Sequence, residues 1–344
     1  MQDSLHIDFD LSRLGSYLAG IWPEAGRLIG IQRYKGGQSN PTYRLDFEHR
    51  RAVLRRKPFG TLLKSAHAIE REYRVQDALK GTGVPVARMI HLCEDPAVIG
   101  ATFYVMEHVD GRIFWDPALA EIDRSDRRAY YEAMARALAS LHRVDPQTIG
   151  LGDFGRPGSY FERQVARWTT QYRASETEKR PDMDRVIAWL AETPSPADDR
   201  ATLVHGDFRI DNMIFDPARP EILCFLDWEL STIGHPFADI SYQCMQWRLP
   251  NQGVISGLGG IDRAASGIPT EEDYLAIYCE AAGIKEIPHW SYYLVFNFFR
   301  LAAILDGVNR RVLDGNAADP ERGRRMAASI PMLAQMAVEI IDRS

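Results

Sequence analysis

Apolar and polar residues alternate along several short runs in the first third of the chain, which is the pattern of half-buried β-strands. Two runs flank a glycine-bearing turn within residues 29–47, and a third covers residues 52–58. Two more, Val84–Leu92 and Thr102–Met106, bring the expected number of strands to five. The first third therefore predicts a small sheet whose turns bring consecutive strands side by side.

Helical periodicity appears once before these strands and once between them, and it dominates the chain after residue 110. Apolar residues recur at helical spacing in Leu11–Ile21 and in Ser65–Lys80. Further helices are expected at Asp126–His142, Tyr160–Arg173, Met183–Leu190, 239–247, Glu271–Glu280, His289–Arg311 and Asp319–Ile341. Because 344 residues exceed the usual size of one core, we expect two domains, residues 1–109 and 110–344.

The helical region is interrupted by the stretch LVHGDFRIDNMIFDPARPEILCFLDWE, at 203–229. Its two apolar runs, separated by DPARP, predict a β-hairpin. Asp207 and Asn212 precede the first run, and Asp227 follows the second. Two carboxylates and an amide at the ends of one small sheet are hard oxygen ligands of the kind that Mg²⁺ prefers.

The spacing from Asp207 to Asn212 matches the kinase catalytic loop H-R-D-x-x-x-x-N, with Gly206 in place of the arginine. Asp227 stands where kinases have the metal-binding Asp of D-F-G. On these residues the chain resembles the aminoglycoside phosphotransferase (APH) and choline kinase-like family. The resemblance implies an α+β, bilobal protein kinase-like fold, with a five-stranded antiparallel N-lobe carrying one main helix and a largely helical C-lobe.

The resemblance also implies ATP and Mg²⁺ as cofactors and assigns site residues. Asp207 would be the catalytic base, and Asn212 and Asp227 would hold the metal. In the N-lobe, Arg55 takes the position of the kinase lysine, with Arg56 on the opposite face of its strand. The remaining nucleotide-binding candidates are the turn residues Gly36, Gly37, Ser39 and Asn40, the helix acid Glu72 that would pair with Arg55, and the backbone of Glu107 and Val109 at the linker between the lobes.

Composition narrows the partners. A net charge of −6 gives no overall attraction to nucleic acid, so we expect none as a partner. The four cysteines are far apart, without the spacing of a metal site, and Cys224 lies in an apolar run that predicts a buried side chain. The start MQDSLHIDFD is not a signal peptide, and Asn297 and Arg300 interrupt the most apolar helix. We therefore expect a cytoplasmic protein without a membrane span.

Two polar residues and one loop have alternative interpretations. Asp239 suits either a helix cap or a structural acid that fastens the catalytic loop, which is its role in kinases. Asn297 is either satisfied within the core or faces a cleft. The glycine-rich segment NQGVISGLGGID, at 251–262, lacks the strand and helix of a nucleotide-binding loop, so it predicts a mobile loop or lid.

The acceptor is a small molecule whose identity stays open. FFRLAAILDGVNRR, VLRRKPFG and AHAIEREYRV resemble the branch that includes the kinase-like domain attached to some acyl-CoA dehydrogenases, which acts on hydroxyacyl-CoA. Coupling to such a dehydrogenase would occur in trans. Candidate cations for CoA phosphates are Arg56, Lys57, Arg310 and Arg311.

The alternatives to a hydroxyacyl-CoA kinase are an aminoglycoside or amino-alcohol kinase and a non-catalytic nucleotide-binding scaffold. A protein kinase is disfavoured, because Asp227 and Asp239 are too close in sequence to enclose an activation segment.

Overall fold

A computed structural model describes residues 7–34, 40–59, 68–197, 199–317 and 319–344. The candidates Gly36, Gly37 and Ser39 lie outside these residues. The chain divides into two compact units. The first unit comprises Met1–Arg112, Ile214–Pro217 and Leu223–Ser231; the second comprises Ile113–Met213, Ala218–Ile222 and Thr232–Ser344. The assignment of nucleotide binding to residues 1–109 and of catalysis to residues 110–344 stays a prediction.

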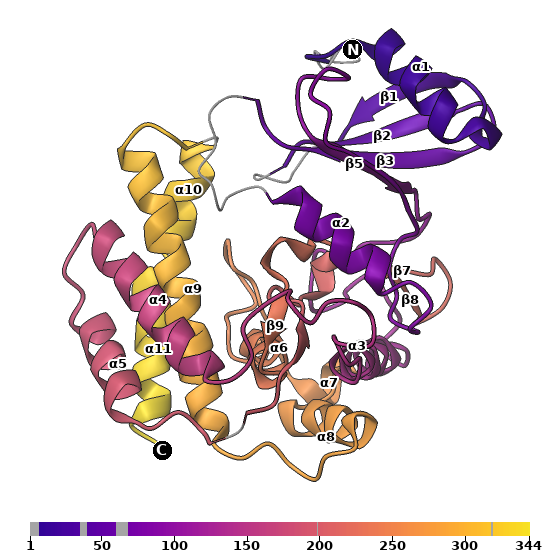
Figure 1. Cartoon of the computed structure of the whole chain (residues 1–344). Helices are drawn as coiled ribbons and strands as arrows, with labels where there is room; N and C mark the ends of the chain where they lie inside the picture. The colour runs from indigo at the N-terminus through magenta and orange to yellow at the C-terminus, as the bar shows by residue number, and fades with distance from the viewer. Residues whose placement is uncertain (1–6, 35–39, 60–67, 198, 318) are drawn as a thin grey trace. The chain divides into compact units, whose positions relative to one another are not determined.

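A five-stranded antiparallel sheet forms the centre of the first unit, as expected (Figure 1). Its strands are β1 (Leu28–Arg33), β2 (Thr42–Phe47), β3 (Arg51–Arg56), β4 (Met89–Cys93) and β5 (Phe103–Glu107), in the order β1-β2-β3-β5-β4. The predicted strand at 84–92 is shorter at its start, because residues 85–88 adopt no regular structure.

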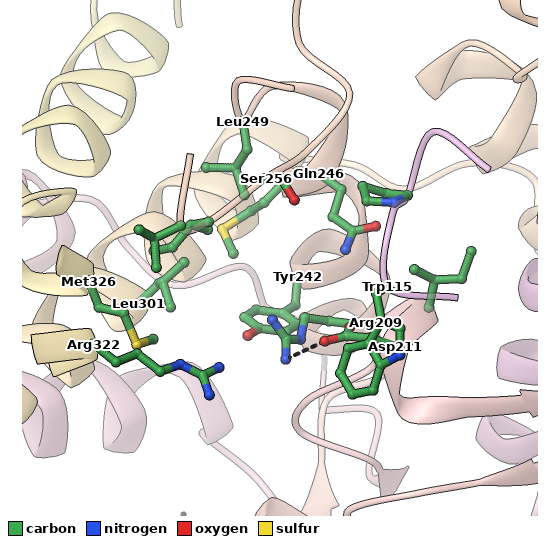
Figure 2. Close-up of a pocket in the computed structure, with 15 residues that line it drawn as sticks. Trp115, Arg209, Asp211, Tyr242, Gln246, Leu249, Ser256, Leu301, Arg322 and Met326 are labelled. Carbon is green, nitrogen blue, oxygen red and sulfur yellow. Dashed lines mark ion pairs between the residues drawn. The ribbon is translucent and has the colours of Figure 1, made fainter. Parts of the chain in front are cut away.

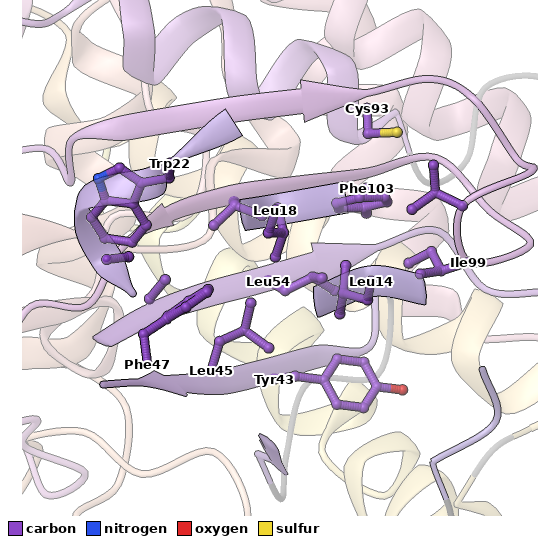
Figure 3. Close-up of a cluster of buried hydrophobic side chains, with 14 residues drawn as sticks. Leu14, Leu18, Trp22, Tyr43, Leu45, Phe47, Leu54, Cys93, Ile99 and Phe103 are labelled. Atoms are coloured by element: carbon purple, nitrogen blue, oxygen red, sulfur yellow. The ribbon is translucent and has the colours of Figure 1, made fainter. Parts of the chain in front are cut away.

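Each face of the sheet packs against a helix. α1 (Leu11–Ile21) places Leu14 and Leu18 against Leu45, Leu54 and other apolar side chains of the strands, as Figure 3 shows. α2 (Ile69–Ala78) places Ile69 on the other face in a cluster with Met89 and Tyr104. Because strand side chains alternate, Leu54 and Arg55 point to opposite faces, and Arg55 projects toward α2.

The first unit also receives two pieces of chain from the central stretch. β7 (Met213–Phe215) pairs with β8 (Ile222–Phe225), and η3 (Trp228–Leu230) follows. Arg112 and Phe215 exchange two backbone hydrogen bonds of 2.8 Å, which join the end of the linker to β7. The predicted hairpin is confirmed, and Asp227 belongs to the first unit although it follows the catalytic loop in sequence.

The second unit is largely helical. Its helices are α3 (Arg127–His142), α4 (Tyr160–Ser175), α5 (Pro181–Glu192), α6 (Phe237–Cys244), α7 (Arg263–Ser266), α8 (Glu271–Ala282), α9 (Trp290–Leu313), α10 (Pro320–Ala327) and α11 (Ile330–Ile341). The long α9 packs against α4, α5, α6, α10 and α11, whereas α3 packs against α8. A short sheet of β6 (Thr202–Val204) and β9 (Thr232–Gly234) carries the catalytic loop.

Several observed elements differ from those that the periodicity predicted. The predicted helix at 319–341 is two helices, because α10 ends at Ala327 and Pro331 lies in the first turn of α11, where a proline is tolerated. The strands β6 and β9 were not predicted. The four cysteines are buried and unbonded, and burial was expected for Cys224. In the part of the chain that the structure describes, no helix is both long and apolar enough to cross a bilayer.

Candidate active site

Asp207 and Asn212 face each other across the catalytic loop, which runs from β6 to β7. The 3-10 turn η2 (Ile210–Asn212) folds the loop back, and the Asn212 side-chain nitrogen donates to both the backbone carbonyl and Oδ2 of Asp207, at 2.9 Å each. This contact leaves the amide oxygen of Asn212 as the atom able to bind a cation.

A buried carboxylate holds the start of this loop. Asp239, on α6 and fully buried, accepts hydrogen bonds from the backbone N–H of His205 at 2.6 Å and of Gly206 at 2.8 Å. The Nε2 atom of His142 lies 3.3 Å from Oδ2 of Asp239. Burial acts to raise the pKa of Asp239, but His142, His205 and the Gly206 N–H together bring it below its ordinary value. Of the two roles weighed for Asp239, the structure shows the anchor of the catalytic loop.

Arg300 holds the same loop from α9. Its guanidinium donates to the carbonyl of Gly206 at 2.6 Å, and it lies over the ring of Tyr242, 5.3 Å from the centroid. Arg300 is buried, so this bond is shielded from water. In the sequence Arg300 was noted as a charge that interrupts an apolar helix and as part of FFRLAAILDGVNRR, but this contact was not predicted. Asn297, one turn before it, donates to Ala238 and Ser241 within the core, so it does not face a cleft.

The surroundings of Asp207 favour its ionised form. Burial acts to raise the pKa of Asp207, but the cation of Arg209, at 3.3 Å, and a hydrogen bond from Tyr242 bring the pKa below its ordinary value. A carboxylate that stays ionised near pH 7 can accept a proton from an alcohol. The sequence analysis did not predict a role for Arg209 or Tyr242. Arg209 occupies one of the variable positions of the catalytic-loop motif, so its position near Asp207 could have been noticed.

A second polar cluster lies wholly within the first unit. Arg55 Nε is 2.9 Å from Glu72, and its Nη2 is 2.9 Å from Asp227 and 3.7 Å from Glu229. The predicted pairing of the strand cation with the helix acid is therefore present. Glu72 also accepts from Asn40 at 3.0 Å. Burial raises the pKa of Glu72, although Arg55 opposes that effect.

Asp227 has a strained backbone. Its φ of 62° and ψ of 63° place it in the left-handed region, which costs energy for a residue with a side chain, although aspartate tolerates it better than most. The turn aims the carboxylate at Arg55, as the 2.9 Å ion pair shows. Strain that positions a functional group is typical of active sites, so this geometry supports a role for Asp227 beyond packing.

Glu107 and Val109, the residues predicted to bind adenine, lie at and just after the end of β5. Glu107 is the last residue of β5, and its N–H donates to the carbonyl of Arg88 while its side chain pairs with the Arg88 guanidinium at 3.0 Å. Val109 follows two residues later. The Glu107 carboxylate is paired with Arg88, and the binding of adenine by the backbone of this linker stays a prediction.

Asp227 and Asn212 each carry the kind of oxygen donor that Mg²⁺ prefers. Among residues 7–34, 40–59, 68–197, 199–317 and 319–344, no group of three or more His, Cys, Asp or Glu side chains could hold a metal by itself. Asn212 belongs to the second unit and Asp227 to the first, and each offers oxygen. Few protein ligands are what a magnesium ion bound to nucleotide phosphates requires.

A pocket of about 250 Å³ adjoins the catalytic loop within the second unit (Figure 2). Arg209 and Tyr242, which both interact with Asp207, line it. The loop predicted to be a lid contributes Val254, Ile255 and Ser256 to its wall. The end of that loop is held by backbone hydrogen bonds from Gly257, Leu258 and Gly259 to the segment at 246–250.

The sequence model of the APH phosphotransferase enzyme family matches residues 30–283, which include the sheet, the catalytic loop and Asp227. This chain belongs to that family. Family membership supports small-molecule phosphoryl transfer as its general activity, in agreement with the resemblance seen in the catalytic-loop motif.

Curated relatives of this APH-family chain are larger proteins. It is 48% identical over 307 residues to mouse acyl-CoA dehydrogenase family member 10, covering 88% of this chain and 29% of that protein. It is 38% identical over 341 residues to mouse acyl-CoA dehydrogenase family member 11, covering 98% of this chain and 44% of that protein. The chain thus spans less than half the length of these relatives.

Solved structures confirm the kinase-like fold expected for the APH family. A candidate aminoglycoside phosphotransferase from Ralstonia eutropha JMP134 is 44% identical, with a TM-score of 0.88 over 97% of this chain and 99% of the other. Spectinomycin phosphotransferase APH(9)-Ia, in complex with ADP and spectinomycin, is 13% identical, with a TM-score of 0.63 over 96% and 98% of the two chains. The second likeness concerns the fold alone.

Proposed function

We propose that this protein is an ATP- and Mg²⁺-dependent kinase that phosphorylates a hydroxyl group of a hydroxyacyl-CoA. The observation that carries phosphoryl transfer is the catalytic loop, in which an ionised Asp207 is held by Asn212 in a loop anchored by Asp239. We propose an acyl-CoA as the acceptor because the curated relatives are acyl-CoA dehydrogenase family members.

In the proposed reaction, Asp207 accepts the proton of the acceptor hydroxyl as the hydroxyl oxygen attacks the γ-phosphorus of ATP. The bond from the γ-phosphorus to the β–γ bridging oxygen breaks, and ADP leaves. Asn212 and Asp227 are the residues proposed to hold Mg²⁺, which would supply charge neutralisation on the phosphates. Arg55, Asn40, Gly36, Gly37 and Ser39 are proposed to bind the phosphates, and the backbone of Glu107 and Val109 to bind adenine.

The test is a coupled assay of ADP release with Asp207→Asn and Asp227→Ala. Positioned base catalysis contributes about 10² to 10⁴ in rate, so Asp207→Asn should lower kcat by that factor while leaving the affinity for ATP with Mg²⁺ nearly unchanged. Asp227→Ala should weaken the binding of ATP with Mg²⁺ itself. The matched control is Asp145→Asn, which changes an exposed turn residue far in sequence from Asp207 and Asp227. Wild-type rates in both site variants would refute the assignment.

The acceptor is tested in the same assay. We expect 4-hydroxyacyl-CoA to stimulate ADP release more than kanamycin does, and the reverse order would favour an aminoglycoside kinase. Thermal stabilisation by ATP with Mg²⁺, without turnover of any hydroxyacyl-CoA, amino sugar or amino alcohol, would favour a nucleotide-binding scaffold instead.

A further inference from the structure

The pocket beside the catalytic loop has a mixed lining of polar and apolar side chains. Its apolar side chains include Ile210, Met245, Leu249, Val254, Leu301 and Met326. Its volume of about 250 Å³ is near the lower end for ligand pockets, which suits a small acceptor or one end of a longer one. These side chains can pack against a hydrocarbon segment of an acceptor.

The charges that line the pocket are mainly positive. Arg209, Asp211 and Arg322 are its ionisable members apart from Tyr242, and Asp211 is paired with Arg209 at 3.0 Å. Arg322, on α10, is exposed and forms no ion pair with any residue that the structure describes. Figure 2 shows its guanidinium extending from α10 toward the side of the pocket where Tyr242 lies. Arg209 is paired with Asp207 and Asp211, so Arg322 is the lining cation that remains available to an anionic group of an acceptor.

We propose that this pocket selects an acceptor that joins an apolar segment to an anionic group, and that Arg322 is the specificity-determining contact for the anion. The inference rests on the proposed kinase function and adds the residue that sets acceptor choice. Tyr242 and Arg209 connect the pocket to Asp207, so an apolar segment held there would bring a nearby hydroxyl to the proposed base. The anion is either a carboxylate of the acceptor or a phosphate of its carrier.

The experiment compares acceptors that share one reacting chain and differ in charge. The full chain is assayed for ADP release with 4-hydroxyoctanoyl-CoA, with the uncharged N-acetylcysteamine thioester of the same acid, with free 4-hydroxyoctanoate, and with kanamycin. We expect the anionic CoA thioester to have a KM about tenfold below that of the uncharged thioester. Free 4-hydroxyoctanoate distinguishes a carboxylate contact from a contact to the carrier phosphates.

The variants are Arg322→Gln and Arg325→Gln, each of which removes one exposed arginine from α10. Arg322 lines the pocket, whereas Arg325 does not. Arg322→Gln should raise the KM of the anionic acceptor about tenfold, leave its kcat within about twofold, and leave the uncharged thioester unaffected. Arg325→Gln should change none of these. The KM of the anionic acceptor should also rise with salt in the wild type and less so in Arg322→Gln.

The proposal is overturned if Arg322→Gln leaves the preference for anionic acceptors intact, if it affects charged and uncharged acceptors equally, or if kanamycin is the best acceptor. Those results would leave the kinase assignment standing, because ATP-dependent transfer would still occur. Absence of ADP release with every acceptor would instead contradict the proposed function. Circular dichroism melts of both variants separate an altered preference from a loss of folding.

Discussion

Arg55 lies 2.9 Å from both Glu72 and Asp227, so one guanidinium joins the helix acid to the residue proposed to bind the metal. The side chain is largely buried, with 14% of its surface exposed. Because a guanidinium is planar and forked, it can contact two carboxylates at once, which an ammonium group on a single stem does less well. Arginine at this position therefore links α2, β3 and the turn before η3 in one network.

Removing this guanidinium should be costly. Arg55→Met leaves Glu72 buried beside other carboxylates without a cation, so we expect a loss of about 3 to 5 kcal/mol of unfolding free energy, measured by urea titration. Arg55→Lys keeps the charge and should lose less, and it should weaken the binding of ATP with Mg²⁺ about tenfold if Arg55 contacts phosphate. The control Arg51→Met breaks an exposed pair with Asp110 and should cost under about 1 kcal/mol. Equal losses in the Arg51 and Arg55 variants would contradict a buried network.

Arg300 is expected to act on catalysis by positioning the loop. Arg300→Met removes the donor to Gly206 and a cation that helps to keep the pKa of Asp207 low. We expect kcat to fall about tenfold and its acidic limb to move to higher pH, with KM for ATP little changed. Arg300→Lys should restore part of the rate. Arg136→Met, exposed on α3, is the control.

A purely structural role for Arg300 would lower stability without moving the pH profile of kcat. The pH measurement, rather than the size of the rate loss, therefore decides between the two roles.

Asp239 should make the protein sensitive to acid. Its pKa in the folded protein lies below the ordinary value of 3.8, so its charge stabilises the fold above about pH 4, and that contribution is lost as the pH falls through the lower, folded value. Asp239→Asn should cost about 3 kcal/mol at pH 7, and the difference from wild type should shrink below pH 4. Urea titrations from pH 3 to 7 measure this, with exposed Asp199→Asn as control. A pH-independent difference would contradict the role of the charge.

Gly111 is required by close packing in the first unit. A Cβ at this position would meet the side chain of Ile214 and lie 2.6 Å from the carbonyl oxygen of Phe215. Gly111→Ala should therefore lower the unfolding free energy by about 1 to 3 kcal/mol. Gly20→Ala, in a helix with open space around the added Cβ, should stabilise by about 1 kcal/mol or less. Thermal melts of both variants provide the comparison.

The sequence was informative wherever function or local structure depends on neighbours in the chain. The spacing of Asp207 and Asn212 follows from one loop, and the alternation of Leu54 and Arg55 on a strand determines which residue meets the helix acid. Periodicity located the five strands of the sheet and the long α9. Each of these features depends on residues a few positions apart, whose geometry the backbone fixes.

Only the tertiary structure decided which distant residues complete these groups. Asp239 is 33 residues from Gly206 and Arg300 is 94 residues from it, yet both bond to that glycine. Arg322 lines the pocket from α10. Asp227 belongs to the first unit, whereas the loop that precedes it in sequence belongs to the second. No local pattern encodes such contacts, because they arise when separate elements bury their apolar faces and thereby bring polar side chains into reach.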